Sequence, residues 1–110
     1  LLLDHAASEP SIKSGDREVN ISRRNAILLK KLLLKSAKDE ALSWVEITGY
    51  QEESISDSHE DISWDNYRQR VRRINQKLEE IDLPKLIKNV PTKSYKIENI
   101  NYTIVQYDAQ

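Results

Sequence analysis

Arginine, asparagine and glutamine side chains recur along residues 64–81 at spacings that place them together on one side of a helix. At 100° per residue, the face opposite the apolar side chains carries Asp65, Asn66, Gln69, Arg72, Arg73 and Gln76. Arginine forms bidentate hydrogen bonds with guanine O6 and N7, and asparagine or glutamine with adenine N6 and N7, at about 1–3 kcal/mol of discrimination per pair. The composition of this face therefore indicates readout of base edges in double-stranded DNA.

Positive side chains flank this face and continue into the segment that follows it. Arg70 and Lys77 lie along one flank of the expected helix, and Lys88 and Lys93 come after it in the sequence. Residues 64–96 carry a net charge of +5 within a chain of net charge −1, which leaves −6 on the remaining residues. This division predicts an electropositive surface around the helix, where phosphates would bind.

The helix that must position these side chains has the clearest pattern in the chain. Its apolar residues recur at spacings of three and four: Trp64, Tyr67, Val71, Ile74, Leu78 and Ile81. Ser63 supplies an N-cap and Asp65 a favourable charge in the first turn, while Pro84 ends the helix. A coiled coil is the alternative for such a repeat, but the pattern covers fewer than the roughly three to four heptads that pairing needs.

A β hairpin is expected after this helix. Residues 86–90 and 95–97 are rich in strand-forming side chains, and they flank the turn-forming segment 91–94. Lys93 would lie at the tip of the hairpin, and residues 102–107 alternate well enough to form a last strand. The hairpin would therefore bring positive charge close to the helix.

The first half of the chain predicts smaller elements. Residues 1–10 show no periodicity and are interpreted as a flexible leader, and residues 12–21 read as a short hairpin. Ser22 caps an expected helix over residues 23–36, and Ser43 caps a short one over 44–48. An acidic loop should follow over residues 50–63.

This order of elements predicts an α+β fold of the winged helix-turn-helix type. It would contain three helices, a C-terminal β hairpin wing and a short N-terminal hairpin, formed by residues 11–110 as a single domain after the leader at 1–10. In such a fold the third helix enters the major groove, and the wing at 86–97 contacts an adjacent groove or the backbone.

The sequence resembles the OmpR-type DNA-binding domains of bacterial response regulators. Residues 67–79 look like the recognition helix of that family, residues 86–97 are similar to its wing, and residues 19–34 fit its strand and first helix. The resemblance implies DNA contacts at Asn66, Gln69, Arg70, Arg72, Arg73, Thr92 and Lys93. It also implies that the loop at 50–63 can contact RNA polymerase. Asn75 stands where the family usually has arginine.

Other classes of function find little support in the sequence. The chain has no cysteine for a disulfide or a thiolate metal site, and Gly15 and Gly49 are too far apart to form a phosphate-binding loop. His59 lies among acidic residues, but without the spacing of a helical metal site. No apolar run approaches the roughly 20 residues that cross a bilayer. We therefore expect no enzyme activity, no metal, no cofactor and no membrane insertion.

The resulting prediction is sequence-specific binding of double-stranded DNA, as the effector domain of a cytoplasmic bacterial transcription regulator. Binding as a dimer or in tandem is expected, because a single small module buries little DNA surface. The near-neutral total charge leaves one alternative, a winged-helix module for protein–protein interaction that does not bind DNA.

Overall fold

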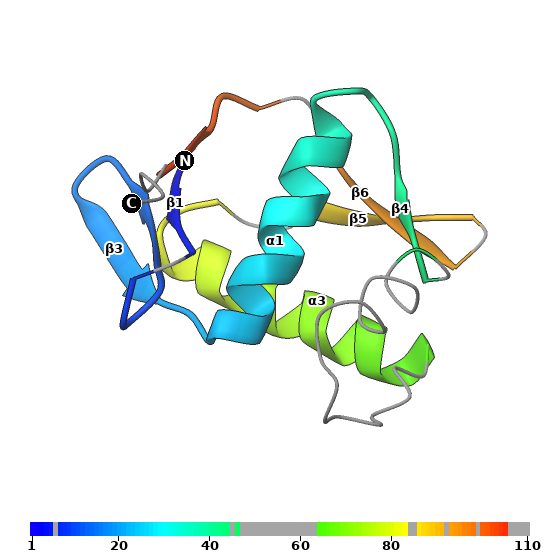
Figure 1. The fold of residues 1–110 in the computed structure, drawn as a ribbon, viewed down its shortest axis with the longest axis horizontal. Helices are drawn as coiled ribbons and strands as arrows, with labels where there is room; N and C mark the ends of the chain where they lie inside the picture. The colour runs from blue at the N-terminus through cyan, green and yellow to red at the C-terminus, as the bar shows by residue number, and fades with distance from the viewer. Residues whose placement is uncertain are drawn as a thin grey trace, which may run out of the picture.

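Two helices and two β-sheets make up the described part of the chain. The computed structural model describes residues 1–5, 7–44, 46, 64–83, 86–91, 93–98 and 100–105. The helices are α1 (Arg23–Ser36) and α3 (Trp64–Glu80). The strands are β1 (Leu2–Asp4), β2 (Ser11–Ser14), β3 (Arg17–Asn20), β4 (Leu42–Ser43), β5 (Ile87–Val90), β6 (Ser94–Ile97) and β7 (Thr103–Ile104). In Figure 1, α1 lies between the sheet that contains β1 and β3 and the sheet that contains β4, β5 and β6.

The four-stranded sheet has the order β3-β2-β1-β7 and joins the two ends of the described chain. A turn at Gly15, which has a φ of 60°, connects β2 to β3. Strand β1 pairs antiparallel with β2 and parallel with β7, so that Leu3 lies opposite Ile12 on one side and Ile104 on the other. Leu3 is fully buried. The expectation of a flexible leader over residues 1–10 is therefore wrong for β1, which is part of the sheet.

Helix α1 forms where its sequence supplies both a cap and an apolar face. The Ser22 hydroxyl accepts a hydrogen bond from the backbone N–H of Asn25 at 3.3 Å, as an N-cap residue should. The buried residues of the helix are Ala26, Leu28, Leu29, Leu32, Leu33 and Ser36. Its bounds confirm the helix expected over residues 23–36.

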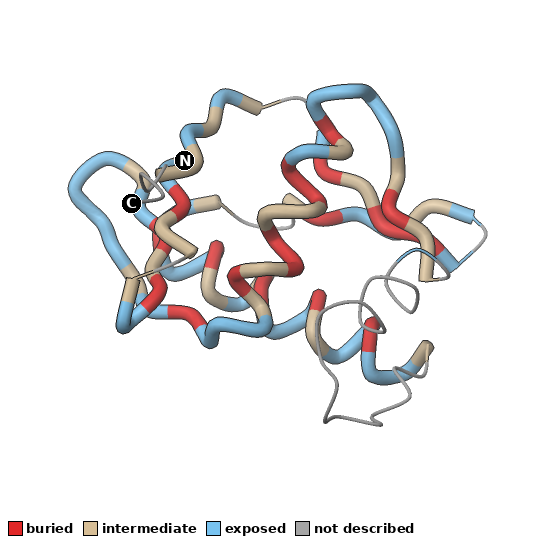
Figure 2. Tube along the Cα trace, viewed as in Figure 1, coloured by how far each residue is buried: buried red, intermediate tan, exposed pale blue. Residues whose placement is uncertain are grey.

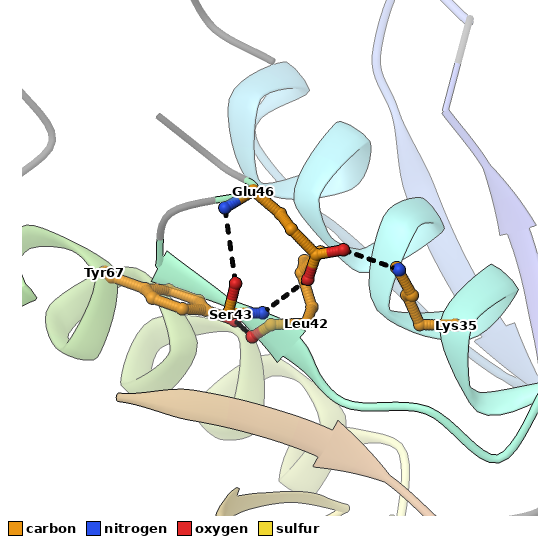
Figure 3. A network of polar contacts seen from close by, with 5 residues as sticks. All are labelled: Lys35, Leu42, Ser43, Glu46 and Tyr67. Atoms are coloured by element: carbon orange, nitrogen blue, oxygen red, sulfur yellow. Dashed lines mark hydrogen bonds and ion pairs between the residues drawn. The ribbon is translucent and has the colours of Figure 1, made fainter. Parts of the chain in front are cut away.

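Strand β4 follows α1 in the sequence and belongs to the second sheet. Ser43 and Glu46 form a reciprocal capping box, in which the Ser43 N–H donates to Glu46 Oε2 at 2.9 Å and the Glu46 N–H donates to Ser43 Oγ at 3.3 Å (Figure 3). Trp44 and Glu46 have helical backbone. The rest of the helix expected over 44–48, and the loop expected over 50–63, lie outside the described residues.

Helix α3 packs its apolar stripe against α1 and the second sheet. Its buried residues are Tyr67, Val71, Ile74 and Leu78, which confirms the predicted stripe at these positions. Buried and exposed stretches alternate along the helix in Figure 2. The Tyr67 hydroxyl donates to the carbonyl of Leu42 at 2.8 Å (Figure 3). Burial raises the pKa of this hydroxyl above its ordinary value, so the group remains a donor. Helix α3 is thereby tied to β4.

Strands β5 and β6 form an antiparallel hairpin that runs from the Ile87 and Ile97 pair to the Val90 and Ser94 pair. Strand β4 pairs with the other side of β6, so the sheet has the order β4-β6-β5 and β5 is an edge strand. Ile87, Tyr95 and Ile97 contribute side chains to the same core as α1 and α3.

The predicted fold of three helices, a C-terminal hairpin wing and a short N-terminal hairpin is wrong. The chain is α+β, but its described residues form seven strands in two sheets and only two helices. The missed strands β1 and β4 contain three and two residues, whereas β7 lies within the last strand expected over residues 102–107. Segments this short carry no period, and they become strands only because distant partners supply their hydrogen bonds.

Candidate nucleic-acid interface

The side of α3 that faces away from the core carries most of the side chains that the sequence predicted to read bases. Its exposed residues include Asn66, Gln69, Arg72, Arg73 and Gln76. They are exposed because the buried stripe fixes the rotation of the helix about its axis, which turns the opposite face outward. Gln69 and Arg73, which are four residues apart, are thus neighbours on the accessible surface.

Arg70 is positioned differently from the prediction, which made it a DNA contact. Its guanidinium is half-buried against the first turn of α1, where Nε donates to Asn25 Oδ1 at 3.3 Å and Nη2 donates to the carbonyl of Arg24 at 2.8 Å. These bonds join the middle of α3 to the beginning of α1. Arg70 therefore positions the helix, and its substitution would disturb the packing of the two helices.

Asn75 positions the opposite flank of α3. Its side-chain N–H donates to the Ile87 carbonyl, and its Oδ1 accepts from the Ile87 N–H, both at 3.1 Å. Strand β5 lies at the edge of its sheet, so the outward N–H and C=O groups of Ile87 have no neighbouring strand among the described residues. The side-chain amide of Asn75 supplies the two hydrogen bonds that such a strand would give to Ile87. The two flanks of α3 are thus fixed, one to α1 and the other to the hairpin.

A groove runs between the exposed face of α3 and the hairpin. One part, of about 420 Å³, is lined by Asp65, Arg68, Gln69, Arg72 and Tyr95. A second part, of about 360 Å³, shares Arg68, Arg72 and Tyr95 and extends to Gln76 and Glu79. The two shared arginines are one helical turn apart, so both guanidinium groups can reach the same anion.

Arg68 was not among the predicted site residues, and the structure adds it. Its guanidinium is 3.5 Å from the Asp65 carboxylate, in a pair that is largely exposed to solvent. An exposed pair of this kind contributes little, about 0–1 kcal/mol, so a phosphate can replace the carboxylate at low cost. The spacing of Arg68 and Arg72 was the signal in the sequence that could have identified it.

The floor of the groove is held by an aromatic cluster. The Trp64 ring stacks on Tyr95 with a centroid distance of 5.5 Å and an interplanar angle of 25°, and Tyr67 meets Tyr95 edge to face at 4.9 Å. Tyr95 is only 8% exposed. Trp64 and Trp44 pack against the core as half-buried residues. The cluster therefore fixes the beginning of α3 against β6.

The predicted cations outside the helix face are mostly engaged in local contacts. Lys77 pairs with Glu80 at 3.7 Å and Lys88 with Glu98 at 3.1 Å, in both cases with substantial exposure. Lys93 Nζ lies 5.4 Å from the centroid of the Trp44 ring, a cation–π contact at the hairpin turn. Thr92 and the loop at 50–63, the expected contact with RNA polymerase, lie outside the described residues.

Other kinds of site find no basis in the part of the chain that the structure describes. It contains no group of three or more histidine, aspartate or glutamate side chains that could hold a metal ion, and His59 lies outside it. It also contains no helix with the length and apolar character to cross a membrane. No family model matches the chain, and no curated protein or solved structure matches it significantly.

Proposed function

We propose that this chain binds double-stranded DNA through the exposed face of α3, as the effector domain of a cytoplasmic bacterial transcription regulator. The observation that carries the proposal is the accessibility of Gln69, Arg72 and Arg73 on a helix whose two flanks are fixed by Arg70 and Asn75. A rigid helix presents its side chains to base edges without ordering them first, which reduces the entropic cost of binding.

The dimensions and charges of α3 fit the major groove. The helix has 17 residues, which gives a length of about 25 Å at 1.5 Å per residue. The major groove of B-DNA is about 12 Å wide and admits an α-helix. The four arginines lie in the first two thirds of α3, whereas Glu79 and Glu80 are close to its end, after Lys77, and would be repelled by phosphates. The N-terminal part should therefore lie deepest, with the positive end of the helix dipole near the DNA.

The groove beside α3 suits the phosphate backbone. Arg68 and Arg72 offer two guanidinium groups over one turn of the helix, and Lys88 and Lys93 are exposed on the hairpin next to it. Each phosphate neutralised adds roughly 0.9 to the slope of log affinity against log salt concentration. Binding that uses these cations should therefore weaken steeply as salt is raised.

Selection from randomised duplexes at low salt, followed by anisotropy titrations of the enriched sequence, tests the proposal. Arg73→Ala or Gln69→Ala should reduce discrimination by about 5- to 150-fold, which corresponds to 1–3 kcal/mol per base contact. Lys88→Ala should weaken binding to all sequences equally and lower the salt slope. The matched control is Lys13→Ala, since Lys13 is an exposed cation on β2 in the other sheet.

Two results would overturn the proposal. One is a selection that enriches no sequence, and the other is unchanged affinity in a Gln69, Arg72 and Arg73 triple alanine variant. Arg70 must stay intact in that variant, because its loss would disturb α1 and confuse a folding defect with a lost contact. Failure of DNA binding would leave protein–protein interaction as the role of the exposed face. The length of the protected DNA would report dimeric or tandem binding.

A further inference from the structure

His5 lies where the four-stranded sheet meets α1. It follows β1 directly, and its ring Nε2 is 3.3 Å from the Nζ of Lys30 in the middle of α1. Leu3, two residues before His5, is fully buried in the core. The contact therefore joins the end of a core strand to the helix that lies between the two sheets (Figure 1).

The surroundings of the two ring nitrogens favour the neutral form of His5. The Lys30 ammonium has donors only, so Nε2 must accept the hydrogen bond, and Nδ1 then carries the proton of the neutral ring. Nδ1 is buried and has no hydrogen-bond partner among the described residues. A second proton would place an N–H donor against the ammonium at Nε2, and it would leave the charged ring without an acceptor at Nδ1. The contact thus requires the neutral ring.

The charged groups around the ring disfavour its protonation on balance. Burial and the charge of Lys30 lower the pKa of His5 below its ordinary 6.5, and the carboxylate of Asp4 offsets them only in part. The neighbouring strands place uncharged residues beside this end of β1, because Ser11 of β2 pairs with Asp4 and β7 ends at Ile104. Lys30 is therefore the charged group that couples a proton on His5 to the packing of α1.

A second contact near His5 keeps its charge throughout the same pH range. Arg23 Nη2, in the first turn of α1, donates to the carbonyl of Ala7 at 3.0 Å. Arg23 and Lys30 are seven residues apart, or about two turns, so they lie on the same side of α1. Because arginine stays charged, this bond holds the chain after β1 on α1 while His5 titrates. The effect of acid should therefore be confined to the end of β1 and to what pairs with it.

The pairing of β7 depends on β1. Among the described strands, β7 pairs with β1 alone. The Thr103 N–H donates to the Leu1 carbonyl at 2.8 Å, and the Val105 N–H donates to a carbonyl of the same strand, that of Leu3, at 2.9 Å. Movement of β1 would break these bonds, so the two amides report whether β1 is in place.

We propose that His5 and Lys30 form a pH-sensitive contact, which holds β1 on α1 at neutral pH and releases the end of β1, together with β7, in acid. The released state takes up the proton more readily than the folded state. The stability that the contact contributes is therefore complete above the ordinary pKa of 6.5 and decreases as pH falls through the lower folded-state pKa. Repulsion between two unit charges about 4 Å apart changes an equilibrium about fivefold even in water. This inference does not depend on DNA binding by α3.

Proton NMR titration of the histidine rings tests the first step. The chain has two histidines, and the signal that His5→Gln removes identifies His5. Its pKa should lie below 6.5 in the wild type. Lys30→Gln keeps a donor for Nε2 but removes the charge, so it should raise the pKa of His5. The matched control is Lys13→Gln, which removes an exposed positive charge from β2 opposite β1 and should leave that pKa unchanged.

Hydrogen exchange of the Thr103 and Val105 amides tests the release. Their protection factors, corrected for the intrinsic pH dependence of exchange, should fall by about three- to fivefold between about pH 7 and about pH 5 in the wild type. Glutamine does not titrate, so the protection should not change with pH in His5→Gln. The amides of the β5 and β6 hairpin serve as an internal reference and should keep their protection.

Three results would overturn the inference. They are a pKa of His5 at or above 6.5, protection of the two amides that does not change with pH, or the same loss in His5→Gln. Circular dichroism checks that His5→Gln folds. If it does not, Lys30→Gln replaces it in the exchange experiment, where a smaller loss supports the inference and an undiminished loss overturns it. Neither readout involves DNA, so a failure here is distinguishable from a failure of the proposed function.

Discussion

Replacing Asn75 with leucine tests whether one side chain fixes the hairpin to α3. The substitution keeps the branching of the side chain at Cγ but removes a donor and an acceptor, both of which bond the backbone of Ile87 at 3.1 Å. Among the described residues β5 is an edge strand, so no other strand of that part of the chain pairs with this side of Ile87. The N–H and C=O of Ile87 would then face an apolar side chain in a half-buried position.

The expected cost follows from the two lost bonds. Each hydrogen bond contributes a net of about 0.5–1.5 kcal/mol, and a buried group left without a partner costs about 1–3 kcal/mol. Partial access of water to the position reduces the penalty, so we expect Asn75→Leu to lower the free energy of unfolding by about 2–4 kcal/mol. At roughly 4 °C per kcal/mol for a domain of this size, Tm should fall by about 8–16 °C.

Urea unfolding followed by tryptophan fluorescence measures this loss, with Gln76→Leu as the exposed neighbour that should change stability by less than about 0.5 kcal/mol. Asn75→Asp sharpens the test. The ionised carboxylate would accept a hydrogen bond from the Ile87 N–H but repel the Ile87 carbonyl. The protonated carboxyl group can accept from that N–H and also donate to that carbonyl. Folding should therefore raise the pKa of the introduced carboxyl.

The stability deficit of Asn75→Asp should in consequence be small below about pH 4 and grow as pH rises through the folded-state pKa. A deficit that does not depend on pH, or a loss below about 0.5 kcal/mol in Asn75→Leu, would refute the role assigned to Asn75.

Two further predictions concern the contacts around β4 (Figure 3). Tyr67→Phe removes the 2.8 Å bond to the Leu42 carbonyl without changing packing, and it should lower the free energy of unfolding by about 1–2 kcal/mol in urea titrations, more than Tyr102→Phe at a half-buried position. Glu46→Gln keeps a capping side chain but removes the charge that pairs with Lys35. Because the folded-state pKa of Glu46 is depressed, its contribution is present above its ordinary pKa of about 4.5 and is lost as pH falls through the lower folded value. The wild type should thus exceed Glu46→Gln by about 0.2–1 kcal/mol at pH 7 and by less at pH 3; a gap that widens in acid would contradict the assignment.

Sequence patterns predicted α1 and α3 because each helix contains its own period. The expected ranges 23–36 and 64–81 agree closely with Arg23–Ser36 and Trp64–Glu80, since a stripe of apolar residues and a cap or stop signal lie within each segment. Strand β1 had no such signal. Its partner β7 is about 100 residues away, and Leu3 becomes a core residue only when that pairing forms.

The same distinction applies to the candidate interface. The exposure of Gln69 and Arg73 follows from the period of α3 alone, because both lie opposite its buried stripe. The roles of Arg68 and Arg70 could not be predicted in this way. The two lie on opposite flanks of the buried stripe, and the period of the helix does not show which flank another element covers. Only the position of α1 makes Arg70 a structural residue and leaves Arg68 beside the groove.

The exposed residues of α3 and the residues that bond its neighbours are different residues, which explains why α3 can carry many charges and still pack in a fixed position. Its mean composition is strongly polar, yet one polar residue on each flank, Arg70 or Asn75, bonds backbone groups of a neighbouring element. Those bonds fix the rotation of the helix, so the charges between them need no partner from the protein to stay oriented. Substitutions at Gln69 or Arg73 should consequently alter binding without altering stability, whereas substitutions at Arg70 or Asn75 should lower stability. A variant of Arg73 that unfolds as readily as one of Arg70 would mean that the exposed face is itself part of the packing.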